Sequence, residues 1–396
     1  MSDVSIGIAA SSRDWSLGLH RFVADHGGAR VRVRVMHPED AFDEAYDVLV
    51  IDDITSFLSA HFVREVQRRD RKVLGVFEET AGERRLHSLG VDAVISTVAT
   101  PEQFIATIVD LAASREVDEE FAELVAGLDE GDDSPAAPDK GRLLVVGGAG
   151  GGVGATEIAV AIAGELADRR LRVVLVDADD VSPNVAQRMA MPLHPNIRTA
   201  MDSLQHHSGN VSEALVPHPS GFFVLLGLPN VRDWAEIRSG DAVDVIDTLV
   251  DSADVVVVNV SPMVEESMAG SRGEGRFGVT RHLISLADDV ALVAGQSPTA
   301  IVRTINWVAD THALLGQTSL HLVVNRFQDG VFVRGEIEQE MHDLVRPSSI
   351  TFVPYDPKIA RAAWEGTRVA KSGFCKAVAT VVDRVLPVAT KQRTGS

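Results

Sequence analysis

Hydrophobic residues recur along the chain in short runs, most of them too short and too rich in β-branched residues to be helices. Before residue 117, five such runs alternate with stretches of helical periodicity. The runs fall at 4–9, 31–35, 48–51, 73–77 and 93–95. The clearest helical stretches are 57–67 and 102–113. This alternation predicts an α/β fold, a small doubly wound parallel sheet of the flavodoxin-like type.

The same alternation returns on a larger scale after residue 140. Apolar runs fall at 143–146, 173–176, 222–226, 255–258, 290–294, 320–324 and 350–353. They are nearly continuous rather than alternating, as parallel strands buried on both faces require. A second α/β domain with a mainly parallel sheet is therefore expected. Apolar residues within 371–389 have helical spacing with few basic neighbours, which favours a packed terminal helix over a membrane-surface helix.

The boundary between the two regions is compositional. Residues 118–139 contain nine carboxylates and no Lys or Arg. The first part of this segment is able to form the end of a helix. The remainder contains proline and many like charges that repel one another, which is typical of a linker. We therefore expect a first domain at 1–116, an acidic linker at 117–140, a second domain at 141–388 and a disordered tail at 389–396.

Composition narrows the class of protein. The 396 residues carry a formal net charge of −20, which disfavours strong nucleic-acid binding. The single cysteine, Cys375, excludes an internal disulfide. No apolar run reaches the roughly 18 residues of a transmembrane helix, and the N-terminus lacks the pattern of a secretory signal. A cytoplasmic protein is expected.

The most informative segment is a glycine-rich turn between a strand and a helix. Six glycines occupy the eight positions 147–154, after the apolar run 143–146 and before the helical pattern 158–169. Glycines allow positive φ angles and let backbone N–H groups approach an anion, and a helix N-terminus adds further donors. The turn therefore predicts a phosphate-binding loop.

Two nucleotide classes fit this turn. Gly150, Gly152 and Ala155 satisfy the dinucleotide pattern G-x-G-x-x-G/A, with Asp177 where an acid would bind a ribose. Alternatively, Gly154 and Thr156 fit a phosphate loop related to G-x-x-x-x-G-K-[ST], in which the threonine hydroxyl binds Mg²⁺.

A pair of acids after the next strand favours the second class. Asp177 and Asp179 follow the run 173–176 at i and i+2, so both can face the loop. One would face metal-bound water and the other the attacking water. A dinucleotide site needs only one acid there.

These residues carry a resemblance to a known family. The segment 148–156, the Asp177-x-Asp179 pair and the later segments 323–326 and 353–356 resemble the MinD/ParA family of deviant Walker ATPases. Within it, GGVGAT is most similar to the CpaE/TadZ pilus-assembly branch, including the actinobacterial septum-site-determining (Ssd-like) proteins. These proteins place an atypical ATPase domain behind a receiver-like domain.

The resemblance implies ATP and Mg²⁺ as cofactors, bound in a sandwich homodimer. It places Thr156 and Asp177 at Mg²⁺, and Asp177 and Asp179 in the switch region as the catalytic candidates. It implies that Asn325 reaches the adenine edge, although a strand-end cap is an equal reading of this residue taken alone. The implied nucleotide contacts are Gly150, Gly151, Gly152, Val153, Gly154, Ala155, Thr156, Glu157, Asn325, Arg326, Pro354 and Asp356.

The sequence departs from the family at its cations. Gly150 stands at the signature lysine position, Ala155 at the second lysine, and Asn259 where an acid is expected. Positioned cations supply much of phosphoryl-transfer catalysis. We therefore expect nucleotide binding with weak or absent hydrolysis.

The first domain resembles a receiver with its chemistry lost. Asp52 stands at the phospho-acceptor position, but Ser11 and Thr97 stand near positions where receivers carry acid and lysine. One carboxylate cannot hold Mg²⁺ against water. The favoured reading of Asp52 and Asp53 is that they are polar strand-end residues, in a pseudo-receiver that binds a partner or helps to dimerise.

Three functions follow. The first is a CpaE/TadZ-like positioning protein that localises pilus-assembly or division machinery, working with a protein partner. It allows recruitment to a cell pole or septum at the inner face of the membrane, with peripheral membrane association left open. The second is a nucleotide-independent scaffold, and the third a dinucleotide-binding oxidoreductase, which lacks a catalytic His, Lys or Tyr constellation.

Overall fold

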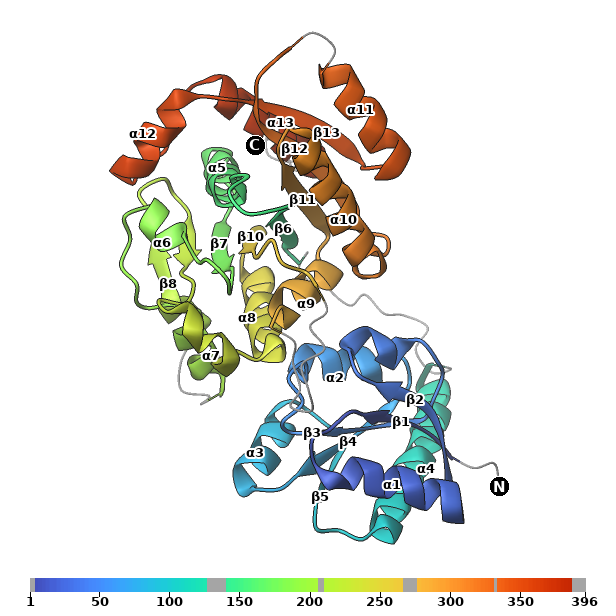
Figure 1. The fold of residues 1–396 in the computed structure, drawn as a ribbon. Helices are drawn as coiled ribbons and strands as arrows, with labels where there is room; N and C mark the ends of the chain where they lie inside the picture. The colour runs from blue at the N-terminus through green and yellow to red at the C-terminus, as the bar shows by residue number, and fades with distance from the viewer. Residues whose placement is uncertain (1–3, 127–139, 206–209, 266–275, 331–332, 387–396) are drawn as a thin grey trace. The chain divides into compact units, whose positions relative to one another are not determined.

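The computed structural model describes residues 4–126, 140–205, 210–265, 276–330 and 333–386, and of 115–126 it describes the backbone only. The chain divides into two compact units, drawn in blue to teal and in green to red in Figure 1. The first contains residues up to Asp139 with two short later segments, and the second contains most of the rest. The predicted linker residues 127–139 and tail residues 389–396 lie outside the described ranges.

The first unit is built on a five-stranded parallel sheet of order β2-β1-β3-β4-β5. Its elements are β1 (Val4–Ala9), α1 (Asp14–His26), β2 (Ala29–Val35), the 3-10 helix η1 (Pro38–Phe42), β3 (Val48–Asp52), α2 (Ala60–Gln67), β4 (Lys72–Phe77), α3 (Thr80–Ser88), β5 (Ala93–Ser96) and α4 (Pro101–Ala126). The order is the flavodoxin-like one, as expected. Each predicted strand is present.

Alternating residues of the central strand β3 face opposite layers of helices. Val48 and Val50 lie in one apolar cluster with residues of α1 and α4. Leu49 and Ile51 lie in a second cluster with residues of α2 and α3. Because side chains alternate along a strand, a run of consecutive apolar residues is needed to fill both layers.

The second unit contains an eight-stranded sheet of order β13-β12-β11-β6-β10-β7-β9-β8. Its strands are β6 (Arg142–Gly148), β7 (Val173–Ala178), β8 (Leu215–Pro217), β9 (Phe223–Leu225), β10 (Val255–Val260), β11 (Asp289–Ala294), β12 (Ser319–Phe327) and β13 (Ser349–Pro354). All pairs are parallel except β8 with β9, which is antiparallel. The predicted mainly parallel sheet is confirmed, and the short edge strand β8 was not predicted.

Helices cover both faces of this sheet (Figure 1). They are α5 (Ala155–Asp168), α6 (Val185–Arg188), α7 (Ile197–Gln205), η2 (Val211–Ala214), η3 (Val231–Glu236), α8 (Ser239–Ser252), α9 (Gly278–Leu286), α10 (Pro298–Leu315), α11 (Val333–Leu344), α12 (Pro357–Glu365) and α13 (Gly373–Val385). Helices α5 and α13 pack together on one face, and α9 and α10 contact β6 and β11.

The terminal helix packs as predicted. Phe374, Val378, Val381, Val382 and Val385 are buried in the same apolar cluster as the core residues of α5. None of the helices within the described ranges has the length and apolar character that a membrane span requires.

Candidate functional site

The glycine-rich turn connects β6 to α5 at the carboxyl edge of the second sheet. Gly152 and Gly154 have φ angles of 78° and 93°, which side chains rarely tolerate. A Cβ atom at Gly151 or Gly152 would meet no described atom within 4 Å. The turn therefore presents bare backbone on an open side.

Neighbouring strands hold this turn in place. The Ala149 N–H donates to the Val293 carbonyl at 2.9 Å, and the Asn325 side-chain amide donates to the Val153 carbonyl at 2.9 Å. A Cβ at Gly154 would lie 2.5 Å from Asn325 Nδ2. Asn325 is thus buried against the loop that it anchors, and its predicted contact with an adenine edge stays a prediction.

The first turn of α5 offers backbone N–H groups as hydrogen-bond donors. Its N-cap is Gly154, which offers no side-chain cap. The first N–H groups of a helix have no intrahelical partner, and the helix dipole favours an anion beside them. Thr156 lies in this turn, and within the described chain its hydroxyl makes no hydrogen bond.

Asp177 lies at the end of β7, 1% exposed. One carboxylate oxygen accepts a hydrogen bond from Asn259 Nδ2 at 3.0 Å, and the other accepts from the Val185 N–H at 3.0 Å. Burial raises the pKa of Asp177 to about 6, against the lowering effect of these hydrogen bonds. The carboxyl group of Asp177 is therefore held in place, but burial makes its ionisation unfavourable.

Asn259 faces Asp177 from the adjacent strand β10 and is equally buried. Its Oδ1 atom is buried without a hydrogen-bond partner in the described part of the chain. A buried amide oxygen left unpaired is unfavourable, so such an atom points to a partner such as metal-bound water. In the sequence, Asn259 stands out only as a departure from the family pattern.

Asp179 has a different environment from Asp177. Its Oδ1 accepts from the N–H groups of Val181 and Ser182, both at 2.9 Å, and its Oδ2 accepts from the Ser182 hydroxyl at 3.2 Å. These contacts form a local turn after the strand. The structure thus places both predicted acids beside one another but commits Asp179 to its own loop.

Glu157 is also engaged within the protein. It forms a two-pronged ion pair with Arg188 of α6, in which Nη2 and Oε1 are 2.8 Å apart. Arg188 also donates to the Thr367 carbonyl. Sequence patterns gave no signal for Arg188, because its partner lies on a different helix.

The remaining predicted contacts lie at the ends of β12 and β13. Arg326 is exposed with a positive φ of 54°. Asp356 caps α12, since its Oδ1 accepts from the Lys358 N–H at 3.0 Å. Pro354 ends β13. All of these residues share the carboxyl edge with the glycine turn, where ligands of open α/β sheets bind.

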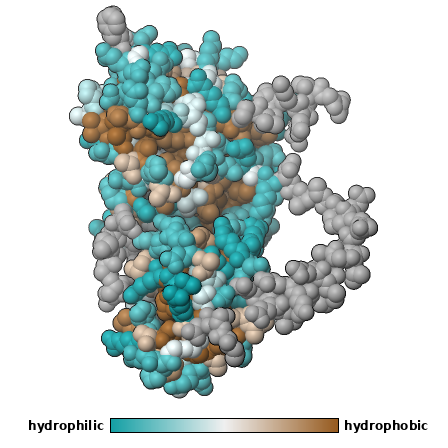
Figure 2. Space-filling model, turned by 90° about the vertical axis from the view of Figure 1, so that its right-hand side faces the viewer, coloured by the Kyte–Doolittle hydropathy of each residue, from teal (hydrophilic) through white to brown (hydrophobic). Residues whose placement is uncertain are grey.

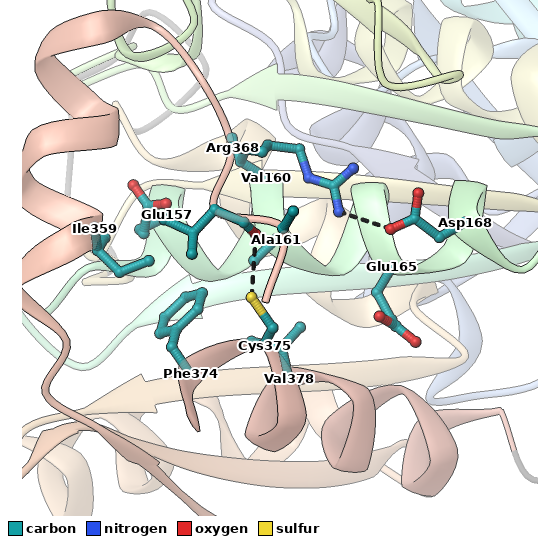
Figure 3. Close-up of a pocket in the computed structure, with 12 residues that line it drawn as sticks. Glu157, Val160, Ala161, Glu165, Asp168, Ile359, Arg368, Phe374, Cys375 and Val378 are labelled. Carbon is teal, nitrogen blue, oxygen red and sulfur yellow. Dashed lines mark hydrogen bonds and ion pairs between the residues drawn. The ribbon is translucent and has the colours of Figure 1, made fainter. Parts of the chain in front are cut away.

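A small cavity lies along α5, from Glu157 in its first turn to Asp168 at its end (Figure 3). Its volume is about 30 Å³, room for little more than a water molecule. Cys375 lies at its wall, and its thiol donates to the Val369 carbonyl. Arg368 pairs with Asp168 across the other side. This cavity is therefore a packing gap where α13 and the segment that precedes it lie against α5.

A larger hollow, of about 660 Å³, lies at the amino ends of the strands, the edge opposite the glycine turn. His321 is buried there, with Nδ1 2.8 Å from the Ser349 hydroxyl and Nε2 3.2 Å from Asp289. It therefore joins three strands by hydrogen bonds, which is a structural role.

Comparison with known proteins identifies the second unit. Residues 144–369 match the CobQ/CobB/MinD/ParA nucleotide binding domain family, and this segment starts in β6 and includes the glycine turn. The chain belongs to this family. The prediction of a phosphate-loop NTPase domain of the MinD/ParA type is confirmed at that level.

Solved structures share the fold. A ParA family ATPase from Chlorobium tepidum TLS has a TM-score of 0.52 and 15% identity, over 62% of this chain and 98% of its own. A variant of McdA from Cyanothece, in complex with ATP, has a TM-score of 0.50 and 15% identity, over 64% and 98%. No curated protein matches the sequence.

The residues of this family member suit a nucleotide phosphate and Mg²⁺. The open backbone at Gly151 and Gly152 leaves room that a side chain would fill. The unpaired Asn259 oxygen and the Thr156 hydroxyl supply oxygen donors of the kind that Mg²⁺ prefers. Asp177, once ionised, adds a carboxylate beside Asn259 on the adjacent strand.

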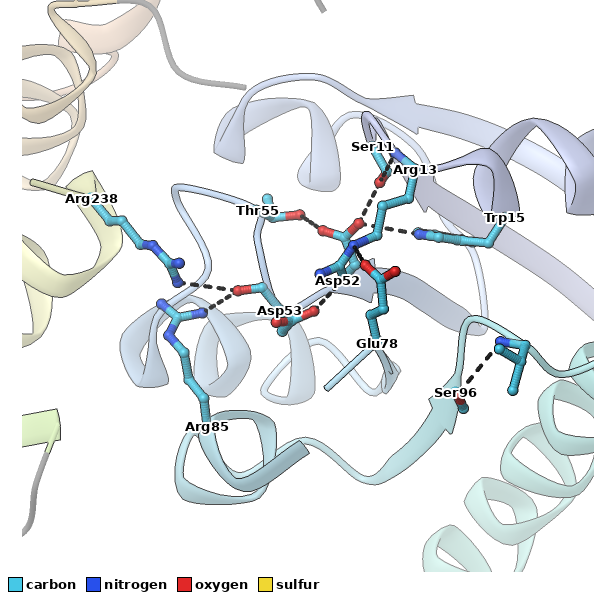
Figure 4. A network of polar contacts seen from close by, with 11 residues as sticks. Ser11, Arg13, Trp15, Asp52, Asp53, Thr55, Glu78, Arg85, Ser96 and Arg238 are labelled. Carbon is cyan, nitrogen blue, oxygen red and sulfur yellow. Dashed lines mark hydrogen bonds and ion pairs between the residues drawn. The ribbon is translucent and has the colours of Figure 1, made fainter. Parts of the chain in front are cut away.

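The acids of the first unit have partners of their own (Figure 4). Asp52 is fully buried and accepts hydrogen bonds from Ser11, Trp15 Nε1 and the Thr55 hydroxyl. Asp53 forms an ion pair with Arg13, whose Nε also lies 3.1 Å from Glu78. The guanidinium thus occupies the acidic end of this sheet, where both strand-end carboxylates are already satisfied.

Proposed function

We propose that this protein binds ATP with Mg²⁺, forms a homodimer across the nucleotide and positions pilus-assembly or septum and division machinery, as CpaE/TadZ-like proteins do. The observation that carries the proposal is the glycine turn at the N-terminus of α5, open at Gly151 and Gly152 and at the same edge of the sheet as the Asp177–Asn259 pair. The ATP bound in the similar McdA structure supports the choice of nucleotide.

The division of labour within the site follows from its donors. Backbone N–H groups of the loop and of the first turn of α5 hold the phosphates, since neither Gly150 nor Ala155 brings a charge. Thr156, Asp177 and Asn259 hold the metal with its water. A bound Mg²⁺ offsets phosphate charge. Asp177 binds it only when deprotonated, so burial of this carboxyl makes metal binding pH-dependent.

Weak or absent hydrolysis is part of the proposal. Both lysine positions of the loop lack a cation, and Asp179 is committed to hydrogen bonds in its own turn. An attacking water therefore lacks an obvious carboxylate to orient it, and the loop itself brings no cation to the transition state. Nucleotide would act as a ligand that controls assembly rather than as a substrate.

The first unit completes this picture as a receiver-like domain that has lost phosphorylation. Its flavodoxin-like strand order supports the receiver comparison. The ion pair of Arg13 with Asp53 puts a fixed cation where a receiver needs an exchangeable metal. We infer that this domain binds a protein partner without a phosphorylation switch.

A nucleotide-independent scaffold is the second candidate. It is favoured by the internal commitments of Glu157 to Arg188, Asp179 to Ser182 and Asn325 to Val153. Residues already satisfied within the fold have less need of a ligand.

Calorimetric titration of ATP, ADP and NAD into the full-length protein, with and without Mg²⁺, separates these functions. The proposal predicts Mg²⁺-dependent ATP binding that Thr156→Ala weakens and Gly152→Val abolishes by filling the cradle. Gly316→Val is the matched control, because Gly316 also has positive φ and open surroundings but ends α10. Absence of any nucleotide binding would establish the scaffold, and binding of NAD alone would establish the dinucleotide class.

A further inference from the structure

The phosphate loop of this protein lacks both of its lysines, yet an arginine from another helix lies against it. A Cβ atom at Gly150, the signature lysine position, would be 3.3 Å from Arg303 Cδ and 3.7 Å from Arg303 Nη1. The guanidinium therefore lies within side-chain reach of the open side of the loop.

The fold explains how this residue arrives there. Strand β11 pairs with β6, so the chain leaving β11 emerges beside the chain leaving β6. Helix α10 then starts at Pro298, capped by the Ser297 side chain, and Arg303 lies in its second turn. Because α10 follows the strand next to β6, a side chain from its second turn can reach the glycine loop.

Arg303 is free to bind a ligand. It is exposed, and no hydrogen bond or ion pair of its guanidinium is found with any residue the structure describes. Several other arginines of the same unit are paired with acids, for example Arg169 with Asp383 and Arg188 with Glu157. An exposed arginine without such a partner beside a phosphate loop is available to an anion.

The glycine at position 150 and the arginine at 303 also depend on each other sterically. A Cβ atom 3.3 Å from Arg303 Cδ is tighter than ordinary packing, so a side chain at position 150 would require Arg303 to shift by a few tenths of an ångström. The glycine at position 150 thus lets Arg303 lie directly against the loop.

We propose that Arg303 supplies the positive charge toward the nucleotide phosphates that the loop itself lacks, and does so from its own chain. This inference rests on the proposed ATP binding. A guanidinium offers fork-shaped donors that match phosphate oxygens and form charge-assisted hydrogen bonds. Arg303 is accordingly a binding residue that raises affinity for the more highly charged nucleotide.

The test is titration calorimetry of ATP and ADP, each with Mg²⁺, on full-length parent, Arg303→Gln and Arg303→Lys. We expect Arg303→Gln to weaken ATP binding at least about tenfold, as loss of a charge-assisted hydrogen bond does. ADP binding weakens less, because ADP carries less charge. Arg303→Lys keeps the charge and recovers part of the loss. The salt dependence of ATP binding falls in Arg303→Gln alone.

Arg346→Gln is the matched control. Arg346 is an exposed arginine in the turn before β13, at the edge of the sheet opposite the loop, and its loss should leave both affinities unchanged. Equal weakening of ATP and ADP by Arg303→Gln, with a lower unfolding temperature, would mean a structural role and overturn the inference. ATP binding in Arg303→Gln equal to the parent's would overturn it while leaving the proposed function standing. A parent that binds no ATP would overturn both.

Discussion

At the scale of single residues, the carboxyl of Asp177 connects the candidate site to stability. Its burial raises the pKa from 3.8 to about 6, although Val185 and Asn259 both donate to the ionised form. The folded protein therefore holds this proton more tightly than the unfolded chain does.

The pH dependence of unfolding should reveal this carboxyl. Its contribution to stability is fully present below about pH 4 and is lost as the pH rises through about 6, an effect of roughly 3 kcal/mol. Denaturant unfolding of parent and Asp177→Asn, in metal-free buffer from pH 4 to pH 7, measures it by difference. The variant should lose less stability over this range than the parent. Parallel curves for the two proteins would contradict the burial argument.

Sequence alone located the polar residues of the site but not their partners. Asp177, Asn259 and Asn325 each follow an apolar run and lie near the carboxyl end of their strand, and parallel strands bring these ends to one edge. The hydrogen bond from Asn325 to Val153 joins residues far apart in the chain, and no local pattern encodes it. The same holds for Arg303 beside Gly150, which depends on strand order.

At the scale of elements, the pair of Glu157 and Arg188 joins α5 to α6 beside the loop. The side chains are 17% and 9% exposed, so each charge depends on the other. Removing one partner leaves the other charge buried and unpaired.

Arg188→Ala should therefore lower the free energy of unfolding by about 3 kcal/mol. The control is Arg361→Ala, which breaks an ion pair with Glu365 on α12 whose side chains are 83% and 51% exposed. That change should leave the free energy of unfolding nearly unchanged, because solvent screens the exposed pair. Chemical denaturation measures both. Similar losses for the two variants would show that the buried pair is no stronger than the exposed one.

Long buried strands were predictable, because a strand that is buried on both faces consists of an almost uninterrupted run of apolar residues. Strand β10 is an example, with four consecutive valines from 255 to 258. The edge strand β8 could not be predicted in this way, because Leu215–Pro217 is short and ends in proline. Helix α4 continues to Ala126, past the predicted start of the acidic linker, because the early carboxylates there are compatible with a helix.

At the scale of the whole molecule, the chain combines a flavodoxin-like unit with a nucleotide-binding unit of the MinD/ParA family. The side drawn in Figure 2 shows hydrophobic patches among hydrophilic residues. Trp364 on α12 is 93% exposed. Tryptophan is enriched in protein interfaces, which suits a protein proposed to act through self-association and a partner.

The most direct test of the central claim is the mass of the full-length protein in solution, measured by light scattering with and without ATP and Mg²⁺. We predict that ATP with Mg²⁺ shifts the mass toward twice the 42.5 kDa of one chain. Gly152→Val should show no shift, while Gly316→Val should behave as the parent does. A parent mass that is the same with and without saturating ATP and Mg²⁺ would contradict nucleotide-controlled dimerisation.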